Sequence, residues 1–244
     1  MRHLSLFSGA GGELLASHYL LGWRTVGYVE WIGYRQQVLR ARIEEGLLHE
    51  APIFGNIDSF ISEGFAASYT GLVDVITAGF PCQGWSNIGK QKGEDDERNK
   101  WPQTRDAIAI VKPKFVLLEN SPNIMSKGFI FQIIEDLSAL GYVGRATRIS
   151  GLHVGAHSKR ERCWIKAELP NAPGGGLEGR DNLIEKWKAK TRSIPPLGKS
   201  VVRMDLPDPR AFRADYGDPS RVDRTEAVGD MQIPAVAATA WSIL

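Results

Sequence analysis

The chain has 244 residues, of which 43% are hydrophobic and 24% charged, and its formal net charge is +2. These values are ordinary for a soluble globular protein, and the length allows one good core with a small appended lobe. No apolar run approaches the roughly 20 residues that span a bilayer, and the start lacks the apolar region of a signal peptide, so we expect no membrane segment. Cys82 and Cys163, the two cysteines, are too few for a disulfide framework or a four-cysteine zinc site, which favours a reducing, cytoplasmic compartment.

Short apolar runs alternate with amphipathic stretches along the first two-thirds of the chain. Residues 72–79 and 114–120 are near-continuous apolar runs, which are typical of central parallel strands covered on both faces. The alternation predicts an α/β fold with a doubly wound, Rossmann-like sheet. We expect strands over 3–8, 24–30, 72–79, 114–120, 143–150 and 163–168, and helices over 12–21, 34–46, 104–111 and 128–140.

The composition changes after Leu169, where the segment PNAPGGGLEG begins a stretch rich in proline and glycine. An apolar, helical pattern returns in EAVGDMQIPAVAATAWSIL, in which Pro234 suits a first helical turn. We therefore expect a core domain over 1–167, a small inserted lobe over 168–222, and a C-terminal segment over 223–244 that returns to the core. Basic residues recur within the expected lobe, which favours a side that faces a polyanion.

A glycine-rich turn follows the first expected strand, where the segment FSGAGG covers residues 7–12. In a parallel α/β sheet, ligands bind beyond the carboxyl ends of the strands, and glycines let the backbone approach a ligand closely. The second expected strand ends in Glu30, whose carboxylate suits a pair of ribose hydroxyls, and Trp31 follows as a stacking partner for adenine. No GK[ST] motif accompanies the turn, which argues against ATP. The sequence therefore favours a cofactor that contains adenosine.

Two further strand ends are expected on the same rim of the sheet. The segment GFPCQGWS places Cys82 after a proline in a glycine-bracketed turn, and VLLENSP places Glu119 at the end of its strand. Each residue alone is compatible with a structural role, as a loop cysteine or a solvated carboxylate. Together, a thiolate nucleophile and a carboxyl group that can hold a proton form an arrangement for covalent catalysis.

In motif order, these segments resemble the DNA (cytosine-5) methyltransferase family over nearly all of the core. FSGAGG is similar to the family's cofactor turn, GFPCQGWS to its catalytic loop, ENS to its Glu-Asn-Val motif and SKRER to its Gln-x-Arg-x-Arg motif. AVGDMQIP is similar to its closing Gly-Asn-x-Val-x-Pro segment. The resemblance implies a DNA (cytosine-5-)-methyltransferase that uses S-adenosylmethionine and acts on double-stranded DNA, as restriction-modification methyltransferases do. It also implies a methyltransferase sheet that carries a target-recognition lobe.

The resemblance implies a mechanism as well. The Cys82 thiolate attacks carbon 6 of a cytosine, and Glu119 binds and protonates the ring at nitrogen 3. Carbon 5 then takes the methyl group, and loss of its proton expels the thiolate. Arg160 holds the cytosine carbonyl, with support from Arg162. Because carbons 5 and 6 are inaccessible inside a duplex, the target base is flipped into the pocket.

The family's motifs assign further contacts residue by residue. Phe7 is expected over the adenine, and Asn56 stands in the segment GNI where the family usually has an aspartate. The resemblance gives as cofactor-binding residues Phe7, Ser8, Gly9, Ala10, Gly11, Gly12, Glu30, Trp31, Asn56, Ile57, Pro81, Trp101 and Asp230. It gives as DNA contacts Gln83, Ser86 and Arg98.

Several positions depart from the family pattern. His157 and Ser158 replace a usual Pro-Gln pair, and Asp230 replaces an asparagine beside the cofactor. Two alternatives therefore stay open: a cytosine-5 methyltransferase that acts on transfer RNA, and a catalytically impaired relative that binds DNA. Cys163 lies in an expected strand and is predicted to belong to the core. We expect a monomer without a metal ion, encoded by a bacterium or a phage.

Overall fold

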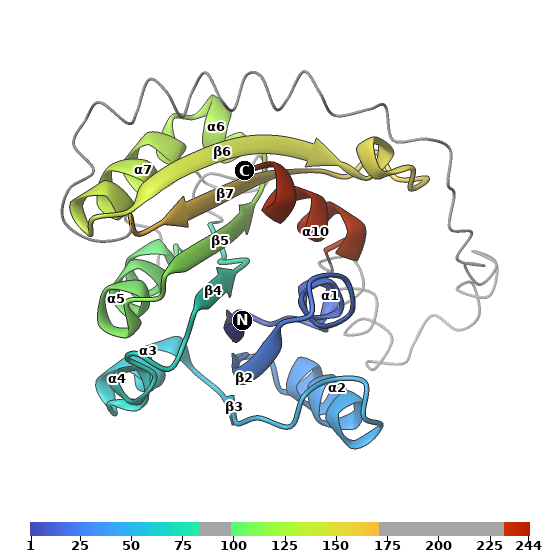
Figure 1. Ribbon diagram of the computed structural model, residues 1–244, viewed down its shortest axis with the longest axis vertical. Helices are drawn as coiled ribbons and strands as arrows, with labels where there is room; N and C mark the ends of the chain where they lie inside the picture. The colour runs from blue at the N-terminus through green and yellow to red at the C-terminus, as the bar shows by residue number, and fades with distance from the viewer. Residues whose placement is uncertain (83–98, 171–231) are drawn as a thin grey trace, which may run out of the picture.

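The computed structural model describes residues 1–82, 99–170 and 232–244. Its strands are β1 (Arg2–Leu6), β2 (Arg24–Val29), β3 (Ile53–Phe54), β4 (Val75–Ala78), β5 (Phe115–Asn120), β6 (Val143–Ser150) and β7 (Glu161–Glu168). Within these residues they form one seven-stranded sheet in the order β3-β2-β1-β4-β5-β7-β6 (Figure 1). The strands β1 to β5 run parallel, whereas β7 runs antiparallel to both β5 and β6.

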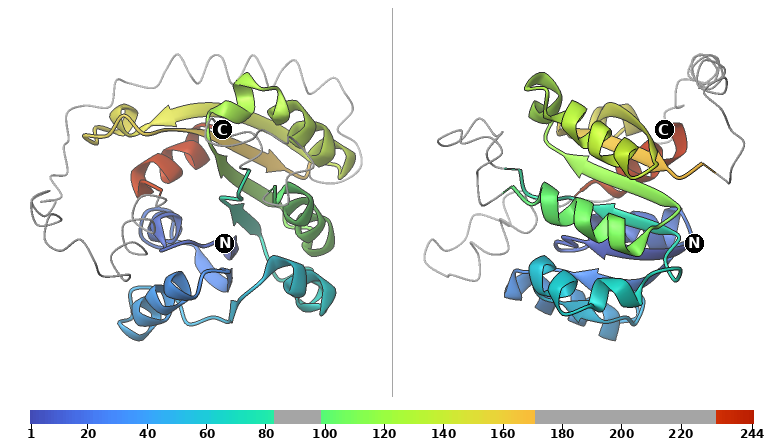
Figure 2. Two further views of the ribbon diagram at one scale, coloured as in Figure 1. Left: turned by 180° about the vertical axis from the view of Figure 1, so that it is seen from behind. Right: turned by 90° about the vertical axis from the view of Figure 1, so that its left-hand side faces the viewer.

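Helices cover both faces of the sheet, as Figures 1 and 2 show. One face carries α1 (Gly12–Leu15), the π-helix η1 (Ala16–Leu20), α2 (Gly33–Glu44) and α10 (Pro234–Ile243). The other face carries α3 (Ile57–Ser62), α4 (Phe65–Ser68), α5 (Trp101–Val111), α6 (Asn123–Ser126) and α7 (Phe129–Ala139). The arrangement confirms the expected doubly wound α/β fold. None of the helices in the described ranges is long and apolar enough to cross a membrane.

The expected strands and helices are present with small shifts at their ends, but three features are not predicted by the sequence pattern. The strand β3 has only two residues, which is too short to show a period. The short helices α3, α4 and α6 form where no element is expected. The antiparallel direction of β7 arises because a short 3-10 helix, η4 (Gly151–Val154), joins it to β6 instead of a helical crossover.

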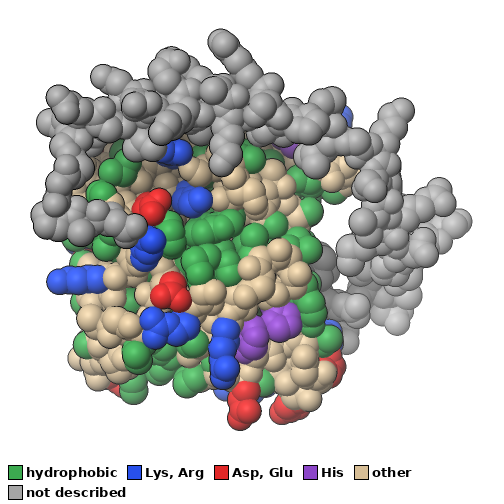
Figure 3. Space-filling view, in the orientation of Figure 1, with side chains coloured by type: hydrophobic (Ala, Val, Ile, Leu, Met, Phe, Trp, Pro, Cys, Tyr) green, Lys and Arg blue, Asp and Glu red, His purple; other side chains and the backbone are tan. Residues whose placement is uncertain are grey.

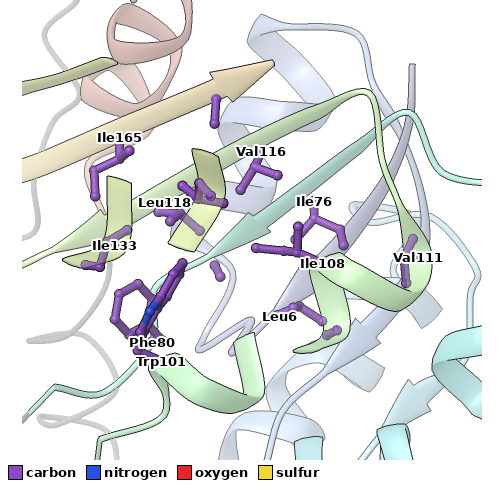
Figure 4. Close-up of a cluster of buried hydrophobic side chains, with 14 of the residues drawn as sticks. Leu6, Ile76, Phe80, Trp101, Ile108, Val111, Val116, Leu118, Ile133 and Ile165 are labelled. Carbon is purple, nitrogen blue, oxygen red and sulfur yellow. The ribbon is translucent and has the colours of Figure 1, made fainter. Parts of the chain in front are cut away.

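The largest part of the hydrophobic core lies between the sheet and the layer that runs from α3 to α7. Ile76, Val116 and Leu118 are fully buried on this face of β4 and β5. Ile108 of α5 and Ile133 of α7 belong to the same cluster (Figure 4). Full burial of an aliphatic side chain contributes about 1.5–3 kcal/mol. This packing holds in place the two strands that end at the candidate site.

The C-terminal helix α10 packs on the opposite face. Pro234 occupies its first turn, where the missing backbone N–H leaves no helical hydrogen bond unmade. Ala240 is buried in a cluster with Leu117 of β5 and Trp164 of β7. The helix therefore packs against the same sheet. The division of the chain into core, lobe and C-terminal segment stays a prediction, because residues 171–231 lie outside the described part.

Candidate active site

The turn that follows β1 is tightly folded at the carboxyl edge of the sheet. Phe7 has a φ of 55°, and Gly9 and Gly11 have φ values of 58° and 93°. Glycine adopts this left-handed conformation freely, whereas a bulky residue does so at a cost on the order of 1–3 kcal/mol. Such strain gathers at ligand sites. The conformation of Phe7 therefore favours the turn as a binding element.

Glu30 connects this turn to the end of β2. The side chain is almost fully buried, and its Oε2 accepts a hydrogen bond of 2.7 Å from the backbone N–H of Gly9. Its Oε1 accepts another of 2.8 Å from the N–H of Ile32. Each carboxylate oxygen has a second lone pair that remains for a ligand hydroxyl. Glu30 thus fixes the turn and still offers two acceptors.

A cavity of about 510 Å³, here called the Glu30 cavity, opens beside this carboxylate. Trp31 beside the cavity is 70% exposed. The amide oxygen of Asn56 accepts a hydrogen bond of 2.8 Å from the backbone N–H of Asp58 and so caps the start of α3. The same oxygen keeps one lone pair for a ligand. Six residues expected to bind the cofactor line this cavity: Phe7, Glu30, Trp31, Asn56, Ile57 and Pro81.

A second cavity of about 320 Å³, here called the Glu119 cavity, lies between the turn and the ends of β4, β5 and β7. Phe7, Arg35, Gly79 and Pro81 line both cavities, so the two spaces are neighbours. The expected site residues that line the Glu119 cavity are Phe7, Ser8, Gly9, Ala10, Gly12, Pro81, Glu119, Arg160 and Arg162.

Cys82 lines neither cavity, but the preceding residue Pro81 and its contact Asn120 both line the Glu119 cavity. Its side chain is buried, and the thiol contacts the Oδ1 atom of Asn120. The amide nitrogen of Asn120 donates a hydrogen bond of 3.0 Å to the carbonyl of Phe80, so this side chain orients the segment that carries the cysteine. Burial raises the pKa of the Cys82 thiol to about 11, and the nearby Glu119 charge acts in the same direction. The thiol form therefore dominates at neutral pH.

The carboxylate of Glu119 contacts residues from distant parts of the chain. Arg162 of β7 places its Nε 2.9 Å from Oε1. Gln232 places its Nε2 3.3 Å from Oε2. Gln232 was not expected at the site. It stands where the closing family pattern has a valine, and this departure is the signal in the sequence that could have marked it.

Three other results concern expected site residues. Trp101 lines neither cavity, and its assignment to the cofactor site stays a prediction: the ring is 2% exposed and packs on Phe80 in the core, as Figure 4 shows. Its ring N–H donates a hydrogen bond of 2.6 Å to Asp136. Gly11 also lines neither cavity, and it closes the turn through a hydrogen bond to Ser8. Four expected residues lie outside the described part: Gln83, Ser86, Arg98 and Asp230.

Cys163 is fully buried in the main hydrophobic cluster, which confirms its predicted place in the core. The described residues contain no group of three or more His, Cys, Asp and Glu side chains that could hold a metal ion. On the face drawn in Figure 3, Lys and Arg side chains are interspersed with Asp and Glu. Most of the basic stretch expected to face a polyanion lies in the residues that the structure does not describe.

Comparison with known proteins decides the family. The family model for C-5 cytosine-specific DNA methylases matches residues 1–196. The chain belongs to this family. Type II methyltransferase M.NgoMIV of Neisseria gonorrhoeae is 29% identical to this chain over 238 residues, which cover 85% of the chain and 73% of the relative. M.HhaI of Haemophilus parahaemolyticus is 32% identical over 171 residues, or 68% of the chain and 48% of the relative.

A viral relative, M.CviJI of Paramecium bursaria Chlorella virus IL3A, is 30% identical over 168 residues and is covered to 42% of its length. The chain thus spans between 42% and 73% of the length of these relatives. Among solved structures, a DNMT2 variant of Spodoptera frugiperda aligns with a TM-score of 0.56 and 20% identity, over 72% of this chain and 52% of the other. Dnmt2 of S. pombe aligns with a TM-score of 0.52 and 20% identity, over 76% of this chain and 55% of the other. These similarities show the methyltransferase fold.

Proposed function

We propose that the protein transfers a methyl group from S-adenosylmethionine to carbon 5 of a cytosine in DNA, through a covalent adduct at Cys82. The observation that carries the proposal is the link between the nucleophile and the acid. Asn120 contacts the Cys82 thiol, and the preceding residue, Glu119, lines the cavity that adjoins the Glu30 cavity. A base held against Glu119 would therefore lie beside both the thiol and the cofactor.

The residues of the Glu30 cavity fit S-adenosylmethionine, which enzymes of this family use. The buried carboxylate of Glu30 offers acceptors for both ribose hydroxyls. Trp31 and Phe7 offer aromatic faces for the adenine ring. Gly12 leaves no room for a side chain, because an added Cβ would lie 2.5 Å from the carbonyl oxygen of Gln232. When bound, the cofactor supplies an activated methyl group on sulfur.

The chain's own residues then act on the base. Cys82, once deprotonated, adds its sulfur to carbon 6 of the cytosine, and the protonated Glu119 gives its proton to nitrogen 3. Arg160 holds the exocyclic carbonyl, and Arg162 orients Glu119. Carbon 5 accepts the methyl group and then loses its proton to solvent. The electron pair of that C–H bond forms the 5,6 double bond and expels the thiolate, and nitrogen 3 returns its proton to Glu119. Because carbons 5 and 6 are inaccessible inside a duplex, the base reaches the cavity only when flipped out.

The partner of the protein is double-stranded DNA, and the lobe over 168–222 reads the target sequence. Of the lobe, only residues 168–170 lie in the described part, so this assignment rests on the composition of the segment. About fifty residues can present only a few side chains to base edges, and each bidentate contact discriminates by about 1–3 kcal/mol. We therefore expect a target of about two to four base pairs.

Covalent trapping tests the proposal. In duplex DNA that contains 5-fluorocytosine, carbon 5 carries a fluorine in place of the proton that must leave. Incubation with cofactor should therefore leave a covalent complex that survives denaturation. Cys82→Ser should not form the complex, whereas the matched variant Cys163→Ser should form it. Trapping by Cys82→Ser would contradict the assigned nucleophile. Trapping by transfer RNA and not by duplex DNA would favour the RNA-directed alternative, and no trapping with either would favour an impaired relative.

A further inference from the structure

A cluster of polar side chains lies inside the protein between the sheet and α1. His3 and Ser5 of β1 and Thr77 of β4 are 0%, 1% and 3% exposed. Glu13 of α1 is 9% exposed, and its Oε2 accepts a hydrogen bond of 3.1 Å from the Thr77 hydroxyl. Burying polar groups costs free energy unless they are paired, so a polar cluster in this place suggests a role beyond packing.

Both ring nitrogens of His3 form hydrogen bonds with hydroxyl groups. The Nε2 atom lies 2.7 Å from the hydroxyl oxygen of Thr77, and the Nδ1 atom lies 3.1 Å from that of Thr25. Glu13 Oε1 is 3.6 Å from the Nε2 atom, which is beyond a hydrogen bond. The histidine is thus held in place by hydroxyl groups, and the carboxyl group of Glu13 has no close cationic partner in these contacts.

Neither member of this pair is charged at neutral pH. Burial raises the pKa of Glu13 to about 8. Burial lowers the pKa of His3 to about 3, and the nearby His49 acts in the same direction. The other titratable or hydroxyl groups around Glu13 are Ser5 of β1, Ser17 of η1, Tyr28 of β2 and Thr77 of β4. The charged groups on the walls of the adjoining Glu119 cavity are Arg35, Glu119, Arg160 and Arg162.

The cluster reaches the candidate active site, because Ser5, Glu13 and Thr77 line the Glu119 cavity. Among the described residues that line it, Glu13 and Glu119 carry the carboxyl groups. Glu119 already faces Arg162 at 2.9 Å. The side of the cavity formed by β1, α1 and β4 therefore offers one carboxyl group, that of Glu13, to a cation.

We propose that Glu13 receives the α-ammonium group of the amino-acid tail of the cofactor, an inference that rests on the proposed function. The Glu30 cavity takes the adenosine part, and the ends of β5 and β7 take the base. The tail is then left with the part of the Glu119 cavity lined by Ser5, Glu13 and Thr77. The ammonium group stabilises the ionised carboxylate, so the neutral acid gives its proton to solvent as the ligand binds.

Calorimetry on the full chain with S-adenosylhomocysteine tests the inference without any turnover. Titrations at pH 6.5 in buffers of different ionisation enthalpy should report about one proton released per ligand, and the affinity should rise about tenfold per pH unit between pH 6 and 7.5. Glu13→Gln keeps the shape of the side chain and should abolish both effects. Glu30→Ala is the matched control: it should weaken binding about ten- to a hundredfold and leave proton release unchanged.

The possible outcomes separate the two proposals. If the wild-type protein binds the ligand without releasing a proton, the assignment of Glu13 is wrong and the proposed function stands. If Glu13→Gln still releases a proton, another group titrates and the assignment is again wrong. If the wild-type protein does not bind the ligand, the proposed function falls together with this inference. The wild-type measurement decides even if the variant fails to fold.

Discussion

Arg162 and Glu119 face each other from neighbouring antiparallel strands, with the guanidinium Nε 2.9 Å from the carboxylate Oε1. The two side chains are 26% and 12% exposed, so solvent screens the pair only in part. A guanidinium at this distance stabilises the ionised carboxylate. The proposed chemistry needs a protonated Glu119 at nitrogen 3 of the base. On the proposed mechanism, binding of the base therefore loosens this ion pair, and we propose that Arg162 acts as a positioning residue.

Replacement of Arg162 should reduce the rate of methyl transfer more than it reduces cofactor affinity. Arg162→Ala removes the side chain that orients Glu119, and we expect a loss of about 10²-fold in single-turnover rate, equivalent to about 2.7 kcal/mol. Arg162→Lys keeps the charge but loses the planar fork and should recover part of the rate. Calorimetry should give an unchanged cofactor affinity. Methyl transfer by Arg162→Ala at the wild-type rate would contradict the role.

Gln232 offers a smaller test of the same carboxylate. Gln232→Val restores the residue of the family pattern and removes the 3.3 Å hydrogen bond to Glu119. A hydrogen bond of this length to a charged group is worth about 1 kcal/mol, so we expect about a fivefold lower single-turnover rate. Equal rates for the wild-type protein and Gln232→Val would show that the contact has no catalytic effect.

The shared rim of Glu30, Cys82 and Glu119 could be predicted because each residue follows an apolar run, and the ends of parallel strands meet at one edge of a sheet. Trp101 could not be placed, because its position at the start of a helix does not reveal that its ring turns toward Phe80 in the core. Gln232 depends on a contact across 113 positions of the chain, which no local pattern encodes.

The buried cluster shows the same limit. Glu13 meets Thr77 across 64 positions, and both residues look ordinary in sequence. A glutamate in a first helical turn usually faces solvent, where its negative charge interacts favourably with the helix dipole. Here the helix packs that residue against β1 and β4, and the burial of its side chain changes its chemistry.

A pair of glycine variants tests the close approach of the C-terminal segment to the turn. In Gly12→Ala, the new Cβ would lie 2.5 Å from the carbonyl oxygen of Gln232 and 2.8 Å from its backbone nitrogen. We expect the free energy of unfolding to fall by about 1–3 kcal/mol. Each kcal/mol lowers the Tm by about 2–4 °C. Gly33→Ala at the start of α2 is the control, since nothing lies within 4 Å of its Cβ position. A Tm for Gly12→Ala equal to the control would contradict the contact.

The thiol of Cys82 should react slowly in the free protein. With a pKa of about 11, about one thiol in a thousand is ionised at pH 8. We expect iodoacetamide to modify Cys82 at least about 100-fold more slowly than a free cysteine at this pH, with the rate still rising above pH 9. Cys82→Ser should show no modification in the folded state, because Cys163 is fully buried. Rapid modification at pH 7 would show that the thiol is not held as described.

The stability of the fold should depend on pH through Glu13 and His3. The pKa of Glu13 is about 8 in the folded chain against an ordinary value of 4.5, so the free energy of unfolding falls as pH rises from 4.5 to 8. The pKa of His3 is about 3 against an ordinary value of 6.5, so its contribution is lost as pH falls from 6.5 to 3. The two effects cancel between pH 4.5 and 6.5.

Above pH 6.5 the effect of Glu13 remains alone, and the free energy of unfolding should fall by up to about 1.4 kcal/mol per pH unit until pH 8. Glu13→Gln removes the titrating carboxyl group at position 13. The Tm of this variant should therefore be constant across this pH window, while the Tm of the wild-type protein falls. Thermal unfolding followed by circular dichroism from pH 6 to 8.5 gives both curves. Because Gln keeps the hydrogen bond from Thr77, a constant difference between the curves reports only altered packing. A difference that grows with pH reports the buried acid, and parallel curves would refute it.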